Sequence, residues 1–288
     1  MENNCHFVCS RGLLKSCDIH SQNPKSSCNN DTNYLIEMLK NNKLKDGMSI
    51  YVCSDLLKYF VSYILPRIDK KFVLVTGDSD MCVPKEALSE KDTYALLKSA
   101  FLVKWFAQNT RIQESDKIIQ MPIGIDYHSL NKITPLEQEQ QIIDIMKTAK
   151  PFYERIQNIH VCFSKSNDRF GQRKACLDRT PKNLLVCNFN CIPRKQLWQI
   201  MSQYAFILSP FGIGMDCHRT WEALCLGCIP IVCAPNFKKM FEDLPVLIVD
   251  DWSDITRELL DKTIEDFKIR TFNLDKLTLK YWVNNIRL

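Results

Sequence analysis

The stretch SPFGIGMDCHRTWEALCLGCIPIV, residues 209–232, decides the fold of the second half of the chain. It begins at the end of an apolar run, YAFILSP, that is typical of a buried strand, and its FGIG segment turns the chain. Apolar residues at helical spacing then predict a helix from about Cys217 to Leu226, with Asp216 as its N-cap. Gly227 ends this helix, and CIPIV predicts another strand. Strand, loop, helix and strand in this order predict an α/β fold with a parallel sheet.

Arg219 and Glu222 lie one turn apart on the side of this helix that does not face the sheet. Such a pair is often a solvated ion pair with no other role. The position favours a ligand site, because open α/β sheets bind ligands where a strand ends and a helix begins. Free N–H groups and the helix dipole favour phosphate there, and an arginine binds it in bidentate geometry. Glu222 is placed to accept hydrogen bonds from ribose hydroxyls.

The same alternation of strands and helices extends over most of the 288 residues. Two sets of strands flank a polar, helical stretch, so we expect two Rossmann-like domains, 1–130 and 157–275, joined by a linker helix region, 131–156. The predicted strands are 5–10, 49–54, 71–77 and 117–123 in the first half and 158–164, 184–189, 204–210, 228–234 and 245–251 in the second. The predicted helices between them include 55–68, 86–101, 193–203 and 253–267.

Composition and charge exclude several classes of protein. The net charge of +5 is small and the basic residues are scattered, which argues against a nucleic-acid partner. No apolar run approaches the roughly 18–20 residues of a membrane span. The start, MENNCHFVCSRG, lacks the pattern of a secretory signal, so we expect a cytoplasmic protein.

The 14 cysteines are many for a chain of this length. Several lie inside apolar runs, including Cys53, Cys162, Cys187 and Cys233, where a free thiol acts as a small buried hydrophobe. We therefore expect free thiols in a reducing compartment. The pairs Cys225/Cys228 and Cys187/Cys191 resemble half-sites for zinc, but a structural zinc needs four ligands, and burial is the better interpretation.

The pattern R-x-x-E-A-L-x-x-G-x-I-P-I-V, residues 219–232, resembles the donor-binding region of exostosin-like glycosyltransferases and, more broadly, of GT-B glycosyltransferases. The resemblance implies two Rossmann-like domains whose parallel sheets face a central cleft, with the last helix, 276–288, crossing back to the first domain. It implies inverting transfer from a UDP- or GDP-linked sugar to a glycan or protein hydroxyl, without an obligatory metal. Arg219 would contact the diphosphate and Glu222 the ribose. A microbial or viral source would explain such a domain outside the secretory route.

A basic loop, CFSKSNDRFGQRK (162–174), follows the first strand of the second half and offers cations to the leaving diphosphate. The alternative is a solvated loop. With it, the predicted donor-binding residues are Ser164, Lys165, Arg169, Arg173, Ser209, Gly212, Gly214, Asp216, His218, Arg219 and Glu222.

Candidates for the catalytic base lie at the ends of two strands of the first half. Asp78 and Asp80 form a D-x-D pattern, which in GT-A glycosyltransferases holds a divalent cation but is also frequent in turns. We prefer Asp80, then Asp78, as general base, with no metal. Asp126 and His128 in MPIGIDYHSL are alternatives, because histidine titrates near neutrality.

Arg11 and Asn109 are the predicted acceptor-side residues. Two other functions remain open at this point. A nucleotide-sugar epimerase or hydrolase would turn over the donor without an acceptor, and a non-catalytic binder would bind it without turnover. A metal-dependent D-x-D enzyme is a further variant, which a chelator would inactivate.

Overall fold

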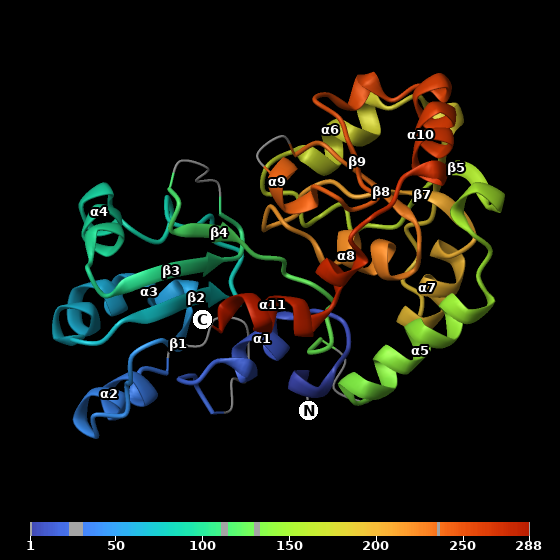
Figure 1. Cartoon of the computed structure of the whole chain (residues 1–288). Helices are drawn as coiled ribbons and strands as arrows, with labels where there is room; N and C mark the ends of the chain where they lie inside the picture. Colours follow the sequence, from blue (N-terminus) through green and yellow to red (C-terminus); the bar gives the residue numbers. More distant parts are fainter. Residues whose placement is uncertain (1, 23–30, 111–114, 130–132, 235–236, 288) are drawn as a thin grey trace. The chain divides into compact units, whose positions relative to one another are not determined.

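The computed structural model describes residues 2–22, 31–110, 115–129, 133–234 and 237–287. It is an α/β structure with two parallel sheets, of four and five strands (Figure 1). The chain divides into two compact units. Unit 1 comprises Met1–Ile123 and Thr278–Leu288, and unit 2 comprises Gly124–Leu277. Each unit contains one sheet, as the alternation of strands and helices predicts.

The sheet of unit 1 has the strand order β1-β2-β3-β4, with all neighbours parallel. Its strands are β1 (Met48–Cys53), β2 (Phe72–Gly77), β3 (Leu102–Ala107) and β4 (Ile118–Gln120). Every residue of β2 is buried, because helical segments and neighbouring strands enclose it. The carboxyl ends of these strands therefore meet at one edge of the sheet.

The helical segments of unit 1 surround this sheet and close its apolar core. They are η1 (Glu2–Asn4), α1 (Ser10–Ser16), α2 (Asn33–Lys40), η2 (Ser54–Leu56), α3 (Leu57–Tyr59), the π-helical η3 (Phe60–Ile64), η4 (Leu65–Arg67), α4 (Glu90–Lys98) and α11 (Leu279–Ile286). The predicted helix 55–68 thus corresponds to the consecutive turns η2 to η4. Helix α11 packs against α1 through Leu279, whose side chain lies close to Gly12.

Two predictions for unit 1 are wrong. Residues 5–10 do not form a strand of the sheet, because Phe7 makes only an isolated antiparallel bridge with Thr278 and α1 begins at Ser10. Strand β3 was missed, since its apolar residues follow a helical pattern without a glycine or proline between them. In the structure Ser99 ends α4, and Trp105 and Phe106, on opposite faces of β3, are both buried.

The sheet of unit 2 has the strand order β6-β5-β7-β8-β9, again with all neighbours parallel. Its strands are β5 (Ile156–Val161), β6 (Leu185–Cys187), β7 (Tyr204–Leu208), β8 (Ile229–Val232) and β9 (Leu247–Ile248). The chain runs from β5 outward to β6 on one side and continues with β7 on the other. The strand order therefore reverses between β5 and β7, which makes their carboxyl ends a topological switch point.

Helices and short turns connect the strands of unit 2. They are α5 (Pro135–Thr148), η5 (Phe152–Glu154), α6 (Gln172–Arg179), η6 (Lys182–Leu184), α7 (Arg194–Met201), α8 (His218–Cys225), α9 (Lys238–Phe241), η8 (Trp252–Asp254), α10 (Arg257–Ile269) and η9 (Leu274–Leu277). Helix α5, which the sequence assigns to a linker region, belongs to unit 2 and packs against α7. A full capping box at Thr134 and Glu137 fixes its start.

The thirteen cysteines in the described part of the chain are all free, as expected. Cys53 is buried, and Cys162 and Cys233 are partly buried. Cys187 is exposed, contrary to expectation, because β6 is an edge strand of its sheet. Among the described residues, the model contains no helix with the length and apolar character that crossing a membrane requires.

Candidate functional site

The switch point of unit 2 brings together the two motifs that the sequence singles out. Strand β5 leads into the loop that begins at Cys162, and β7 leads into the FGIG segment and α8. Because both strands end at the same edge of one sheet, the basic loop 162–174 and the first turn of α8 lie next to each other. We call this group of residues the switch-point site and define it by Cys162, Phe163, Arg173, Arg219 and Glu222.

The first turn of α8 has no side-chain cap, and the prediction that Asp216 caps it is wrong. The N-cap residue is Cys217, whose side chain makes no capping bond. Both carboxylate oxygens of Asp216 accept the indole N–H of Trp221 at 2.9 Å instead, and one also accepts the N–H of Cys217. Burial of the large indole explains this, because its N–H needs an acceptor inside the protein. Asp216 is therefore a packing residue.

Arg219 is held against an aromatic ring and not against an acid. Its guanidinium carbon lies 5.3 Å from the centre of the Phe163 ring. Its Nη1 is buried and has no hydrogen-bond partner among the described residues. No ion pair joins Arg219 to Glu222 within that part of the chain, so the simple surface pair is wrong. A buried, unsatisfied guanidinium N–H is costly, which makes this atom the strongest indication of a missing anion.

Arg173 supplies a second guanidinium at the same ring, 5.6 Å from the centre of Phe163. Its Nη1 donates to the carbonyl oxygen of Ser164 at 2.5 Å, and its Nε donates to that of Phe211 at 3.3 Å. Burial and the neighbouring charge of Arg219 lower the pKa of Arg173. Two arginines that repel each other in this way would both gain from a bound anion.

Gly212 in the FGIG segment allows Arg173 to reach this position. A Cβ atom at Gly212 would lie 2.5 Å from Arg173 Nη2, well inside contact distance. The carbonyl of Gly212 also accepts the N–H of Arg169 at 3.2 Å, and its own N–H donates to Gly214 at 3.1 Å. A glycine is therefore required here by the close approach of the guanidinium.

Glu222 is buried to 8% exposure, and no hydrogen-bond or ion-pair partner of its carboxylate is found in the described chain. The thiol of Cys162 lies within electrostatic reach of both charged residues of the motif. Burial raises the pKa of Cys162, Glu222 raises it further, and Arg219 opposes both effects. Cys162 was expected only as a packing residue, and no pattern in the sequence indicates its place at this site.

The remaining predicted donor residues divide into exposed and structural ones. Ser164, Lys165 and Arg169 are exposed, and Lys165 lies 4.1 Å from the centre of the Phe189 ring. Ser209 is buried and its hydroxyl pairs with that of Thr220 at 2.8 Å, so it fastens β7 to α8. Gly214 is buried in the FGIG segment.

A second group of unit 2 contains His218 together with Asp126 and His128. His218 Nδ1 lies 2.7 Å from the carbonyl oxygen of Gly124, and Arg194 Nη2 lies 2.7 Å from Asp126 Oδ2. Burial acts to raise the pKa of Asp126, but His218, His128 and Arg194 together outweigh it and hold that pKa far below its ordinary value. From the sequence, we expected His218 at the donor site and Asp126 and His128 as alternative catalytic bases.

Most of the candidate residues of unit 1 form contacts with other residues of the same unit. Arg11 Nη2 and Asp78 Oδ2 form an ion pair at 3.3 Å that is almost completely buried. Asn109 is buried and its side-chain amide donates to the carbonyl of Ser79 at 3.0 Å. Asp80 is exposed. The D-x-D pattern thus places one carboxylate in a buried ion pair and the other in solvent, because Asp78 lies at the strand end and Asp80 beyond it.

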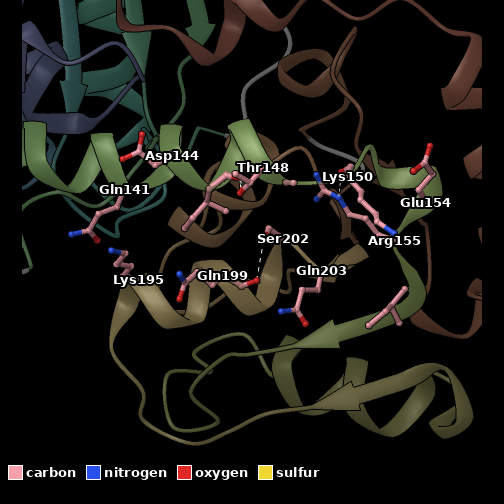
Figure 2. Close-up of a pocket in the computed structure, with 13 residues that line it drawn as sticks. Gln141, Asp144, Thr148, Lys150, Glu154, Arg155, Lys195, Gln199, Ser202 and Gln203 are labelled. Carbon is pink, nitrogen blue, oxygen red and sulfur yellow. Dashed lines mark hydrogen bonds between the residues drawn. The ribbon is translucent and has the colours of Figure 1, made fainter.

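A groove of about 810 Å³ lies at the opposite edge of the unit 2 sheet, where β5 and β7 begin (Figure 2). Polar side chains of α5 and α7 line it, including Asp144, Lys195 and Gln199. Arg155 at its edge donates to the carbonyls of Lys150 and Leu226, and so closes the carboxyl end of α8. Ligands of open α/β sheets bind at the carboxyl edge, so this groove is not our candidate site.

No protein-family model matches the chain, and no curated protein matches it.

Proposed function

We propose that this chain is a glycosyltransferase of the exostosin-like, GT-B type, which transfers a sugar from a UDP- or GDP-linked donor to a hydroxyl. One observation supports the proposal above the others. Arg219 Nη1 is buried and has no hydrogen-bond partner among the residues that the structure describes, and it belongs to a guanidinium that lies beside Arg173 at a topological switch point. This is an arrangement that a diphosphate completes.

The charges of the switch-point site suit a nucleoside diphosphate. Two guanidiniums contact the ring of Phe163, and no acidic side chain in the described chain forms a salt bridge with either of them. The uncapped first turn of α8 adds backbone N–H groups and the positive end of its dipole. The carboxylate of Glu222, one turn further along, can accept hydrogen bonds from the two hydroxyls of a ribose.

The chemistry that follows is displacement at the anomeric carbon. The acceptor oxygen forms a bond to this carbon and passes its proton to a general base, while the bond from the carbon to the phosphate oxygen breaks. The nucleoside diphosphate leaves, and the configuration at the anomeric carbon inverts. Negative charge grows on that phosphate in the transition state. Fixed guanidiniums aimed at it stabilise the charge and accelerate the step, without a role for a metal ion.

Thermal unfolding in the presence of UDP, GDP, CMP and their common sugars tests the donor site. A nucleotide at 100 times its Kd should stabilise the native protein by about 2.7 kcal/mol. We expect this shift with one nucleoside diphosphate, unchanged by a chelator and abolished in Arg219→Ala. The control Arg270→Ala removes an exposed arginine of the same unit and should keep the shift. No shift with any nucleotide, or an equal shift in Arg219→Ala, contradicts the proposal.

The role of Glu222 is tested by removing the ribose hydroxyl from the ligand. Glu222→Gln should weaken binding of the nucleoside diphosphate about fivefold, and it should weaken binding of the 2′-deoxy form less, because that form lacks one of the two hydroxyls. An equal effect on both forms would mean that Glu222 does not contact the 2′-hydroxyl.

Turnover separates transfer from the other two functions. We expect release of the nucleoside diphosphate from the sugar donor to depend on an added acceptor. Release without an acceptor would indicate a hydrolase, and conversion of the bound sugar would indicate an epimerase. Binding that never leads to turnover, with every acceptor class supplied, would indicate a non-catalytic binder.

A further inference from the structure

The side chains of Asp126, His128 and His218 offer one ligand atom each, and these atoms all lie within 4.8 Å of one another. Asp126 and His128 belong to the segment before α5, and His218 is the first residue of α8. Aromatic packing also joins them, since the two imidazole rings meet edge to face with centres 5.9 Å apart. The folding of unit 2 therefore collects three metal-ligating side chains from distant parts of the sequence.

The orientation of His218 is that of a metal ligand. Its Nδ1 lies 2.7 Å from the carbonyl oxygen of Gly124, and a carbonyl can only accept, so Nδ1 carries the hydrogen. The lone pair of the neutral ring is then on Nε2. Metal-bound histidines are held in this way, with the second nitrogen donating to a carbonyl or a carboxylate.

Hydrogen bonds also fix the position of the Asp126 carboxylate. Its Oδ2 accepts from Arg194 Nη2 at 2.7 Å, and its Oδ1 accepts from the backbone N–H groups of His128 and Ser129 at 3.1 and 3.0 Å. Arg194 also contacts the carbonyl oxygen of Asp126 and the side chain of Gln138. Carboxylates that bind metals are positioned by such outer contacts, so Arg194 supports the carboxylate from the side that faces away from His128.

The three ligand atoms lie within 4.8 Å of one another, and one pair already has the separation expected around a coordinated ion. Bonds of about 2.0–2.1 Å in tetrahedral geometry place ligand atoms roughly 3.3 Å apart. His128 Nδ1 and Asp126 Oδ1 are already separated by 3.1 Å. Two imidazoles and one carboxylate favour Zn²⁺ and its neighbours Co²⁺ and Ni²⁺ over Mg²⁺ or Ca²⁺, which prefer oxygen ligands.

We propose that Asp126, His128 and His218 together bind one divalent transition-metal ion, such as Zn²⁺. The ion ties the segment before α5 to the first turn of α8 and leaves a fourth position for water, since the side chain of His128 is 28% exposed. It therefore fixes the residue that precedes Arg219. The inference stands on the geometry of unit 2 and does not depend on the proposed sugar transfer.

Cobalt titration of the whole chain tests this site. We expect one Co²⁺ per chain, with visible d–d absorption and without the charge-transfer bands of thiolate ligands. His128→Gln and His218→Gln should each weaken binding at least about tenfold, the smallest loss expected for a change in the surroundings of a metal. His20→Gln is the matched control, because His20 also bonds to a backbone carbonyl but lies in unit 1.

Two further measurements test whether the exposed thiols bind the metal and whether metal binding stabilises the protein. The double variant Cys187→Ser, Cys191→Ser removes the two exposed thiols and should leave cobalt binding unchanged. Zn²⁺ should raise the Tm of the wild type and of His20→Gln, but not that of His128→Gln. The proposal is overturned if the wild type binds no Co²⁺, if both histidine variants bind it as well as the wild type, or if binding disappears with the two thiols.

Discussion

The carboxyl edges of the two sheets carry polar residues of the same kinds, but the contacts that these residues form differ. In unit 1, Arg11 pairs with Asp78, and Gln108 bonds to Ser10, to the N–H of Asp78 and to the carbonyl of Pro122. In unit 2, Arg219 Nη1 and the Glu222 carboxylate have no such partners in the described chain. The charged side chains of the first edge pair with each other, and those of the second edge form no ion pair with each other in the described chain. Charge at a strand end therefore indicates a ligand site only where its partners are missing.

The largest difference should appear when one arginine is removed from each edge. Arg11→Ala leaves the carboxylate of Asp78 buried without its cation, and it should lower the free energy of unfolding by about 3–5 kcal/mol. Arg219→Ala removes an unsatisfied N–H along with a contact to Phe163, and it should change stability by less than about 1 kcal/mol. Urea unfolding of both variants measures this. Equal losses would remove the distinction between the edges.

A buried histidine near the carboxyl end of β5 provides a pH-dependent reference. His160 on β5 is buried, stacks on Tyr204, and its ring nitrogens lack partners in the described chain. Burial lowers the pKa of His160 to about 4, below the roughly 6.5 of an unfolded histidine. The unfolded chain therefore binds more protons between these values. The stability from this residue is complete above about pH 6.5 and is lost as the pH falls toward 4.

This loss should amount to about 2–3 kcal/mol by pH 4, and most of it should disappear in His160→Phe. Urea midpoints of the two proteins at pH 7 and pH 5 measure the difference. His20→Gln serves as the control and should keep the wild-type pH dependence. Parallel curves for the wild type and His160→Phe would show that His160 is not protonated on unfolding.

A methyl group at Gly212 should affect the second edge without unfolding the protein. Its Cβ would meet Arg173 Nη2 at 2.5 Å, and the guanidinium is the flexible end of a long side chain. Gly212→Ala should therefore displace Arg173 and weaken nucleoside diphosphate binding about tenfold, at a stability loss of about 1 kcal/mol. Arg270→Ala, which removes an exposed arginine of the same unit, is the control for binding. Unchanged nucleotide affinity in Gly212→Ala would separate Arg173 from the ligand.

The smallest effect is expected at a buried neutral group of unit 1. The hydroxyl of Tyr51 is buried without a hydrogen-bond partner in the described chain. Tyr51→Phe should leave stability unchanged or raise it by up to about 1 kcal/mol, because a partnerless hydroxyl contributes only its desolvation penalty. Thermal unfolding decides this, and a clear loss of stability would mean that the hydroxyl is satisfied in solution.

Local patterns were sufficient to predict most of the fold. Apolar runs of strand length correctly predicted all five strands of the unit 2 sheet to within about two residues at their starts, and the motif helix to within one residue. Strand β3 was not recognised, because Lys104 and the preceding helix hide its alternation. The sequence singled out Arg219 and Glu222 as candidate site residues, but spacing alone could not exclude an ion pair between them.

The sequence by itself determined the α/β class and the parallel sheets, because these depend on residues that are near neighbours along the chain. The tertiary structure decided which polar groups have partners. It joined His218 to Gly124, 94 residues away, and Arg194 to Asp126, 68 residues away. It also paired Asp216 with the indole of Trp221 and Asp78 with the buried Arg11. Hydrogen bonds and ion pairs between distant residues form only after the apolar core has placed their backbones together, so no local pattern records them.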